Sequence, residues 1–246
     1  MESTFKKRAR SEQKYERFGE VVRYLNRDEL RVLFDAIDNY THKLMFEVIF
    51  ELGCRVGEFV RIQVKHLNFG RSTVYFPAEN TKTKHARTSY LPPGLMNELI
   101  SMLKQKKIIS KRGGKIYKAD AYVFHHGICW NTHYTENRIR QIFQKYVQKA
   151  GLHQVYGKDT KGRNLKVFTV HSLRHAHLHT NVIDYGIPLP IVQRQVGHVS
   201  LKTTSVYLHP QAETIAQAYQ AAREKDKSAD GKYRKLNFLP EKVDHH

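Results

Sequence analysis

The chain has 246 residues, and its 42 lysines and arginines outnumber 23 aspartates and glutamates, which gives a formal net charge of +19. This charge favours a polyanionic partner such as nucleic acid, because each neutralised phosphate releases condensed counterions. A hydrophobic content of 40% excludes a disordered chain, and the lack of a long apolar run or signal peptide favours a cytoplasmic, DNA-associated protein without a membrane span.

The chain begins with a basic arm, residues 1–25, which we expect to become ordered on an acidic partner. The first helix is predicted to begin after Asn26, an N-cap residue, with Glu29 three positions later as its capping-box partner. The buried face of this helix is predicted from four apolar residues at helical spacing, Leu30, Leu33, Phe34 and Ile37.

A second helix within residues 42–53 is predicted to end at Gly53, since glycine readily takes the left-handed conformation that ends a helix. The next residues indicate a turn, a short helix and an exit into a sheet. Residues 72–76 and 86–92 are predicted to be strands. Their polar connection carries Lys82 and Lys84.

Helical periodicity returns at 94–106 and at 134–151, where one face is apolar through Ile139, Ile142, Phe143 and Tyr146. Residues 156–166 are predicted to be a polar loop, and 171–210 to form three short helices. The tail, 211–246, begins with an alanine-rich helix whose apolar stripe suits docking on its own chain or on a neighbouring protomer. The predicted architecture is α+β and mainly α-helical, with a small antiparallel β-sheet.

Five chemically active elements follow one another along the chain. They are Arg55 with Glu58 in "GCRVGEF", a lysine between the two strands, His171 and Arg174 in "HSLRH", His198 after Gly197, and Tyr207. In this order they resemble the tyrosine recombinase (phage integrase, Xer-like) family. That family's pattern is an arginine in a Gly-x-Arg-x-x-Glu turn, a hairpin lysine, His-x-x-Arg, a Gly-His pair and a nucleophilic tyrosine.

The resemblance implies a tyrosine recombinase catalytic domain at residues 26–210. Such an enzyme performs site-specific DNA recombination or integration through a 3′-phosphotyrosine intermediate, without a metal or nucleotide cofactor. Its implied partners are double-stranded DNA and further copies of itself, as a dimer or tetramer. The alternatives are a topoisomerase-like nicking and closing enzyme and, less favoured, a non-catalytic basic DNA-binding protein.

Family members usually carry a separate helical DNA-clamping domain before the catalytic domain, whereas only about 25 residues precede it here. The sequence is therefore either a natural minimal enzyme or a fragment. Without that domain, we expect DNA binding to depend on the basic arm and the loops.

The chemistry of phosphodiester cleavage explains these residue types. A free tyrosine has a pKa of about 10, so attack by Tyr207 requires a base or a strongly positive site. His171 is the candidate base. Arg55 and Arg174 supply charge and forked donors to the nonbridging oxygens of the transition state. His198 can add a hydrogen bond, and a lysine can protonate the leaving 5′-oxygen.

The family's hairpin lysine usually lies nine residues before the leucine that closes the second strand. Counting back from Leu91 selects Lys82, and Lys84 remains the alternative. Two neighbours of Arg55 depart from the family: Cys54 replaces the commoner leucine, and Gly57 replaces a usual serine or threonine.

Three alternating histidines, His175, His177 and His179, also resemble the ligands of metal-dependent nicking enzymes that use a tyrosine. On a strand they would share one face and could bind a divalent ion. The spacing of Leu178, Val182 and Tyr185 instead favours a helix, which spreads the histidines around its axis. We therefore predict no metal site.

Overall fold

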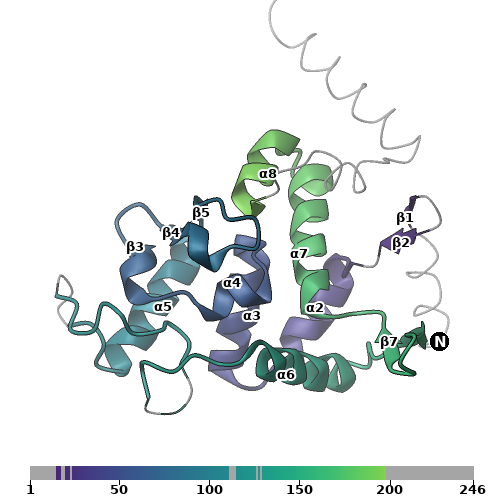
Figure 1. Cartoon of the computed structure of the whole chain (residues 1–246), viewed down its shortest axis with the longest axis horizontal. Coiled ribbons are helices and arrows are strands. Elements are labelled where there is room, and N and C mark those ends of the chain that lie inside the picture. Colours follow the sequence, from purple (N-terminus) through teal and green to yellow (C-terminus); the bar gives the residue numbers. More distant parts are fainter. Residues whose placement is uncertain are drawn as a thin grey trace, which may run out of the picture. The chain divides into compact units, whose positions relative to one another are not determined.

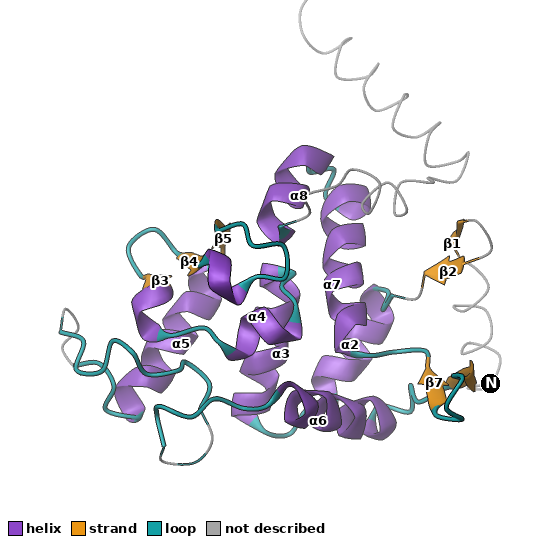
Figure 2. Cartoon of the chain, in the orientation of Figure 1, coloured by secondary structure: helices purple, strands orange, loops and turns teal. Residues whose placement is uncertain are grey.

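A computed structural model of the chain describes residues 15–17, 20–22, 24–110, 115–125, 127 and 129–197 (Figure 1). These residues are mainly helical with small antiparallel sheets, as predicted, although the described residues form three such sheets rather than one (Figure 2). His198, Tyr207 and the tail helix predicted at 211–225 lie outside the described residues. None of the described helices is long and apolar enough to cross a membrane.

The first helix, α2 (Arg27–Asp35), begins with the predicted capping box. The Asn26 side chain accepts a hydrogen bond of 2.7 Å from the Glu29 backbone N–H, and Glu29 accepts one of 3.1 Å from the Asn26 N–H. Of its predicted apolar face, Leu30, Leu33 and Ile37 are buried and Phe34 is half-buried. This local prediction is confirmed.

The next helix, α3 (Tyr40–Leu52), ends at Gly53 in the left-handed conformation, with φ 54°. A Cβ atom at this position would lie 2.6 Å from both His177 Cδ2 and Val196 Cγ1. These residues belong to α7 (Val170–His179) and α8 (Leu189–Val196). Gly53 is therefore required both by the turn and by the close approach of two helices.

A short helix, α4 (Val56–Val60), and a 3₁₀ turn, η1 (Val64–His66), lead into the predicted sheet. Its strands are β3 (Leu67–Asn68), β4 (Thr73–Phe76) and β5 (Arg87–Tyr90), paired antiparallel in that order. Both predicted strands are confirmed. A second 3₁₀ turn, η2 (Ala78–Asn80), follows β4 and leads to Lys82.

Two further helices complete the core. Helix α5 (Pro93–Gln105) buries Met96, Leu99, Met102 and Leu103, and α6 (Glu136–Lys149) buries the predicted face Ile139, Ile142, Phe143 and Tyr146. These side chains join one hydrophobic cluster that also contains the buried faces of α2 and α3. Helix α7 packs against α3, so His171 and Arg174 lie close to the turn that carries Arg55.

Two short hairpins lie where the sequence predicts no strands. One, β1 (Tyr15–Arg17) with β2 (Glu20–Val22), falls within the basic arm. The other, β6 (Val155–Lys158) with β7 (Asn164–Lys166), replaces the predicted polar loop. In the second hairpin, the Asp159 carboxylate accepts hydrogen bonds from the backbone N–H groups of Lys161 and Arg163, which closes a turn between polar, largely exposed strands.

Candidate active site

The turn between α3 and α4 holds Arg55 through Glu58. The Arg55 backbone N–H donates to Glu58 Oε2 at 3.0 Å, and Arg55 Nη1 donates to Glu58 Oε1 at 3.1 Å. Glu58 is only 3% exposed. Because this carboxylate bonds both the backbone and the guanidinium, it determines the direction of the Arg55 side chain.

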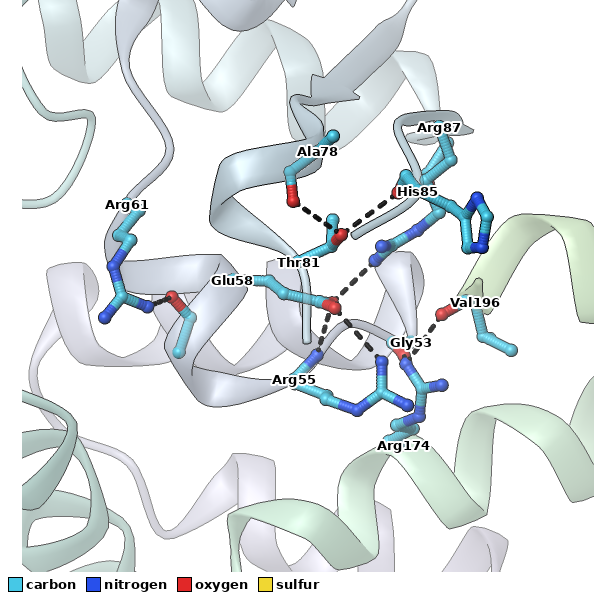
Figure 3. A network of polar contacts seen from close by, with 12 residues as sticks. Gly53, Arg55, Glu58, Arg61, Ala78, Thr81, His85, Arg87, Arg174 and Val196 are labelled. Atoms are coloured by element: carbon cyan, nitrogen blue, oxygen red, sulfur yellow. Dashed lines mark hydrogen bonds and ion pairs between the residues drawn. The ribbon is translucent and has the colours of Figure 1, made fainter. Parts of the chain in front are cut away.

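Glu58 has a second partner, Arg87 in β5, which the sequence analysis missed. Arg87 Nη2 donates to Glu58 Oε2 at 2.7 Å (Figure 3). The Arg87 guanidinium also lies 4.1 Å from the centre of the Phe76 ring. Burial raises the pKa of Glu58, but the hydrogen bond and charge of Arg87 outweigh it, so the pKa is lowered overall. Glu58 is thus a buried carboxylate between two arginines. An arginine directly opposite Phe76 in the hairpin was the available sequence signal.

Arg174 lies near Arg55 and is only 1% exposed. Its Nη1 donates to two carbonyl oxygens at helix ends, Gly53 at 2.6 Å and Val196 at 2.8 Å (Figure 3). Desolvation and the charge of Arg55 lower the pKa of Arg174 to about 9. Within the described residues its buried Nη2 has no hydrogen-bond partner. Buried donors are nearly always paired, so an unpaired one is a candidate ligand-binding group.

A cavity of about 770 Å³ lies in front of these residues, and Arg55, Glu58, Lys82 and His171 are among the residues that line it. Three of the candidate catalytic residues therefore line one cavity, and buried Arg174 lies near enough to Arg55 and His171 to lower the pKa of His171. Both lysines are exposed, but Lys82 lines this cavity and Lys84 does not. The geometry favours Lys82 as the hairpin lysine.

His171, near the start of α7, has a strongly perturbed imidazole. The side chain is exposed to the cavity. Partial desolvation by the surrounding protein, together with the charges of Arg174 and Arg55, lowers the pKa of His171 to about 4. The imidazole is consequently neutral at pH 7 and has a free lone pair with which to accept a proton.

The three histidines of "HAHLH", residues 175–179, point in different directions because the segment is helical, as predicted. The His175 ring packs on His171, with centroids 4.4 Å apart. His177 is buried against Phe50 of α3, and the His179 ring stacks on Tyr24. The strand on which a metal-binding pair would depend is absent from this described segment.

Helix α8 is attached to β5 by Gln195, a second link that sequence reasoning missed. The Gln195 side chain accepts from the Tyr90 N–H at 2.8 Å and donates to the Tyr90 carbonyl oxygen at 2.7 Å. Its backbone oxygen accepts from Ser89 Oγ at 2.7 Å. Gly197 then approaches Arg87 so closely that a Cβ atom would lie 2.9 Å from Arg87 Cδ. This contact explains the glycine before His198, while His198 itself and Tyr207 lie outside the described residues.

Comparison with known proteins gives a consistent result. A family model described as "Phage integrase family" matches residues 23–214. A probable integrase/recombinase of Methanocaldococcus jannaschii is 26% identical over 68% of this chain and 44% of its own length. Tyrosine recombinase XerA of Pyrococcus furiosus is 25% identical over 80% of this chain and 61% of its own. The chain thus spans between about half and three fifths of these relatives.

Solved structures show the same fold. A XerA recombinase crystal structure superposes with a TM-score of 0.59 at 21% identity, over 82% of this chain and 64% of that one. The Tn1549 transposon integrase, in complex with a circular intermediate DNA, gives a TM-score of 0.60 at 16% identity, over 80% of this chain and 65% of that one. At these identities the likeness establishes the fold alone.

Proposed function

We propose that this chain, which belongs to the phage integrase family, is a site-specific DNA recombinase that cuts and rejoins duplex DNA through a 3′-phosphotyrosine at Tyr207. The observation that carries the proposal is that Arg55, Lys82 and His171 line the same cavity, with buried Arg174 close to Arg55. Residues 26–210 would form the catalytic domain.

The two arginines would bind the phosphate to be cleaved. Arg55 is partly exposed to the cavity and is directed by Glu58, so it can offer forked donors to nonbridging oxygens. Arg174 contributes its charge and its Nη2 donor, which has no hydrogen-bond partner in the described part of the chain. Preorganised cations of this kind stabilise the charge that develops in the pentacoordinate transition state. His198 would add a further hydrogen bond.

Proton transfer would involve His171 and Lys82. Neutral His171 accepts the proton of the Tyr207 hydroxyl as its oxygen attacks phosphorus, and Lys82 donates a proton to the leaving 5′-oxygen. Desolvation and the charges of Arg174 and Arg55 depress the pKa of His171. A bound phosphate would offset the charges of the two arginines, which makes the imidazole a stronger base when DNA is present. The phosphotyrosine conserves the energy of the broken phosphodiester, so religation requires no nucleotide or metal.

The proposed partners are duplex DNA and further copies of this chain. Among the structural relatives, XerH was solved bound to its difH substrate, and lambda integrase as a dimer bound to a core site. The net charge of +19 suits such a partner and a DNA-associated location in the cell.

A covalent-trapping experiment tests the function. Duplex DNA nicked close to the cleavage position loses a short fragment after attack, so the phosphotyrosine accumulates. The wild-type protein is expected to form an adduct that survives denaturation, and the Tyr207→Phe protein to form none. An adduct retained in Tyr207→Phe would contradict the assignment of the nucleophile. Relaxation of supercoiled DNA without exchange between two sites would indicate a nicking and closing enzyme instead.

A further inference from the structure

The cavity that contains Arg55 also contains an arginine to which the proposed mechanism gives no role. Arg61 caps the C-terminal end of α4, and Arg55 caps its N-terminal end (Figure 3). Both line the same cavity. Arg61 Nη1 donates to the Gly57 carbonyl oxygen at 2.5 Å, and within the described residues Arg61 makes no other hydrogen bond or ion pair. The rest of its guanidinium fork remains available.

A carboxylate from another helix lies beside Arg61. A Cβ atom at Gly57 would lie 2.7 Å from Glu136 Oε1 and 3.2 Å from Arg61 Nη1. Glu136, in the first turn of α6, therefore occupies the space that a serine or threonine side chain would fill at position 57. The same carboxylate pairs with Arg140 Nη2 at 2.6 Å, and Arg140 and Glu136 also line the cavity.

We propose that Arg61 and Arg140 form a second phosphate-binding site for the DNA backbone, in which Glu136 pairs with Arg140 when DNA is absent. A carboxylate and a phosphate present similar oxygens to a guanidinium fork, so Glu136 takes the place of a phosphate at Arg140, while Arg61 nearby has no anionic partner within the described residues. The inference rests on the proposed function, because it assumes that a DNA strand enters the cavity.

The spacing of the two sites suits one strand. Arg55 and Arg61 lie six positions apart, which corresponds to about 9 Å between their backbones along a helix. A DNA strand carries one phosphate charge for roughly every 3.4 Å of duplex axis. The Arg55 guanidinium is held by Glu58, and the Arg61 guanidinium reaches back to the Gly57 carbonyl oxygen, so the two have separate anchors in one cavity. They can therefore contact different phosphates of the same strand, one to be cleaved and one that fixes its position.

Charge pairing distinguishes the two arginines. Arg55 is already paired with buried Glu58, whereas Arg61 has no acidic partner within the described residues. A phosphate at the second site must displace Glu136 from Arg140 or remain close to it. Glu136 therefore opposes DNA binding, and its removal should strengthen binding.

The experiment measures duplex binding by fluorescence anisotropy across a salt series, with the full chain carrying Tyr207→Phe so that no cleavage occurs. We expect Arg61→Gln to reduce the slope of log affinity against log salt by about 0.9, the value for one phosphate contact. Arg61→Lys should retain the slope. Arg31→Gln is the matched control, because Arg31 is an exposed arginine on α2 that does not line the cavity.

Glu136→Gln provides an independent test with the opposite sign. It should bind DNA several-fold more tightly, and this gain should shrink when Arg61→Gln is also present. The inference is overturned if Arg61→Gln changes the salt slope no more than Arg31→Gln, or if Glu136→Gln fails to strengthen binding. Either result leaves the adduct at Tyr207, and with it the proposed function, intact. A parent protein that binds no duplex would overturn the proposed function itself and the inference with it.

Discussion

At the scale of single residues, Glu58 holds the candidate site together, because it pairs with Arg55 and Arg87 while almost fully buried. Glu58→Gln should lower the free energy of unfolding by about 3 kcal/mol, since removing one member of a buried ion pair leaves its partners without a counter-charge. Adduct formation should fall at least tenfold as Arg55 loses its direction. Denaturant unfolding and single-turnover trapping measure the two effects.

The matched control for this substitution is Glu79→Gln, which removes an exposed carboxylate from the same cavity. It should leave both quantities nearly unchanged. Adding Arg87→Met to Glu58→Gln should recover stability but not cleavage, because it removes the unpaired cation without restoring the contact to Arg55. Recovery of cleavage in the double variant would show that Glu58 does not position Arg55.

The imidazole of His171 leads to a prediction about pH. In the DNA-free protein its pKa of about 4 keeps the ring neutral above that pH. Binding of a phosphate offsets the charges of Arg174 and Arg55, so the pKa should rise in the complex. The cleavage rate at saturating protein reports the pKa in the complex, and the rate at limiting protein reports the pKa in the free state. As the pH falls, the rate at saturating protein should therefore decrease at a higher pH than the rate at limiting protein. Trapping rates from pH 4 to 8 measure both limbs. The role of His171 would be contradicted if the rate decreased at the same pH under both conditions, or if the decrease at low pH persisted in His171→Gln.

At the scale of elements, one glutamine attaches α8 to the edge of the sheet. Gln195→Ala removes two hydrogen bonds to the Tyr90 backbone and should lower the free energy of unfolding by about 1 to 2 kcal/mol. Alanine is the better helix former, so helix propensity alone would change stability in the opposite direction. Thermal and urea unfolding measure the loss, and Gln141→Ala on the exposed face of α6 is the control. Equal stability of the two variants would show that the Gln195 bonds contribute little.

The elements also show which parts of this fold can be predicted from sequence. The capping box at Asn26, the helix end at Gly53 and the two predicted strands depend on neighbouring residues, and all are confirmed. The β6–β7 hairpin was missed because its exposed polar strands show no apolar alternation, and its turn depends on the Asp159 side chain.

The residues of the candidate site also divide into those that a local motif indicates and those that only the fold brings together. The motif pattern selected Arg55, His171 and Arg174, which the fold brings to one place. Arg87 and Gln195 were missed because their partners lie 29 and 105 positions away along the chain. Short-range periodicity carries no signal about such contacts. The same holds for the carboxylate of Glu136 next to Gly57.

At the scale of the whole molecule, a buried histidine should make folding sensitive to acid. His177 is 3% exposed, and desolvation together with the charge of Arg174 lowers its pKa to about 4. In the unfolded chain its pKa is about 6.5, so the unfolded state takes up the proton first as the pH falls. The stability from the neutral ring is therefore complete above pH 6.5 and is lost toward pH 4, by about 3 kcal/mol for the full interval. Urea unfolding at pH 7, 5.5 and 4.5 should show this decline. His177→Phe should reduce the decline, and the lowered pKa of His171 should account for part of what remains. A variant with the same dependence on pH as the wild type would assign the acid sensitivity to other groups.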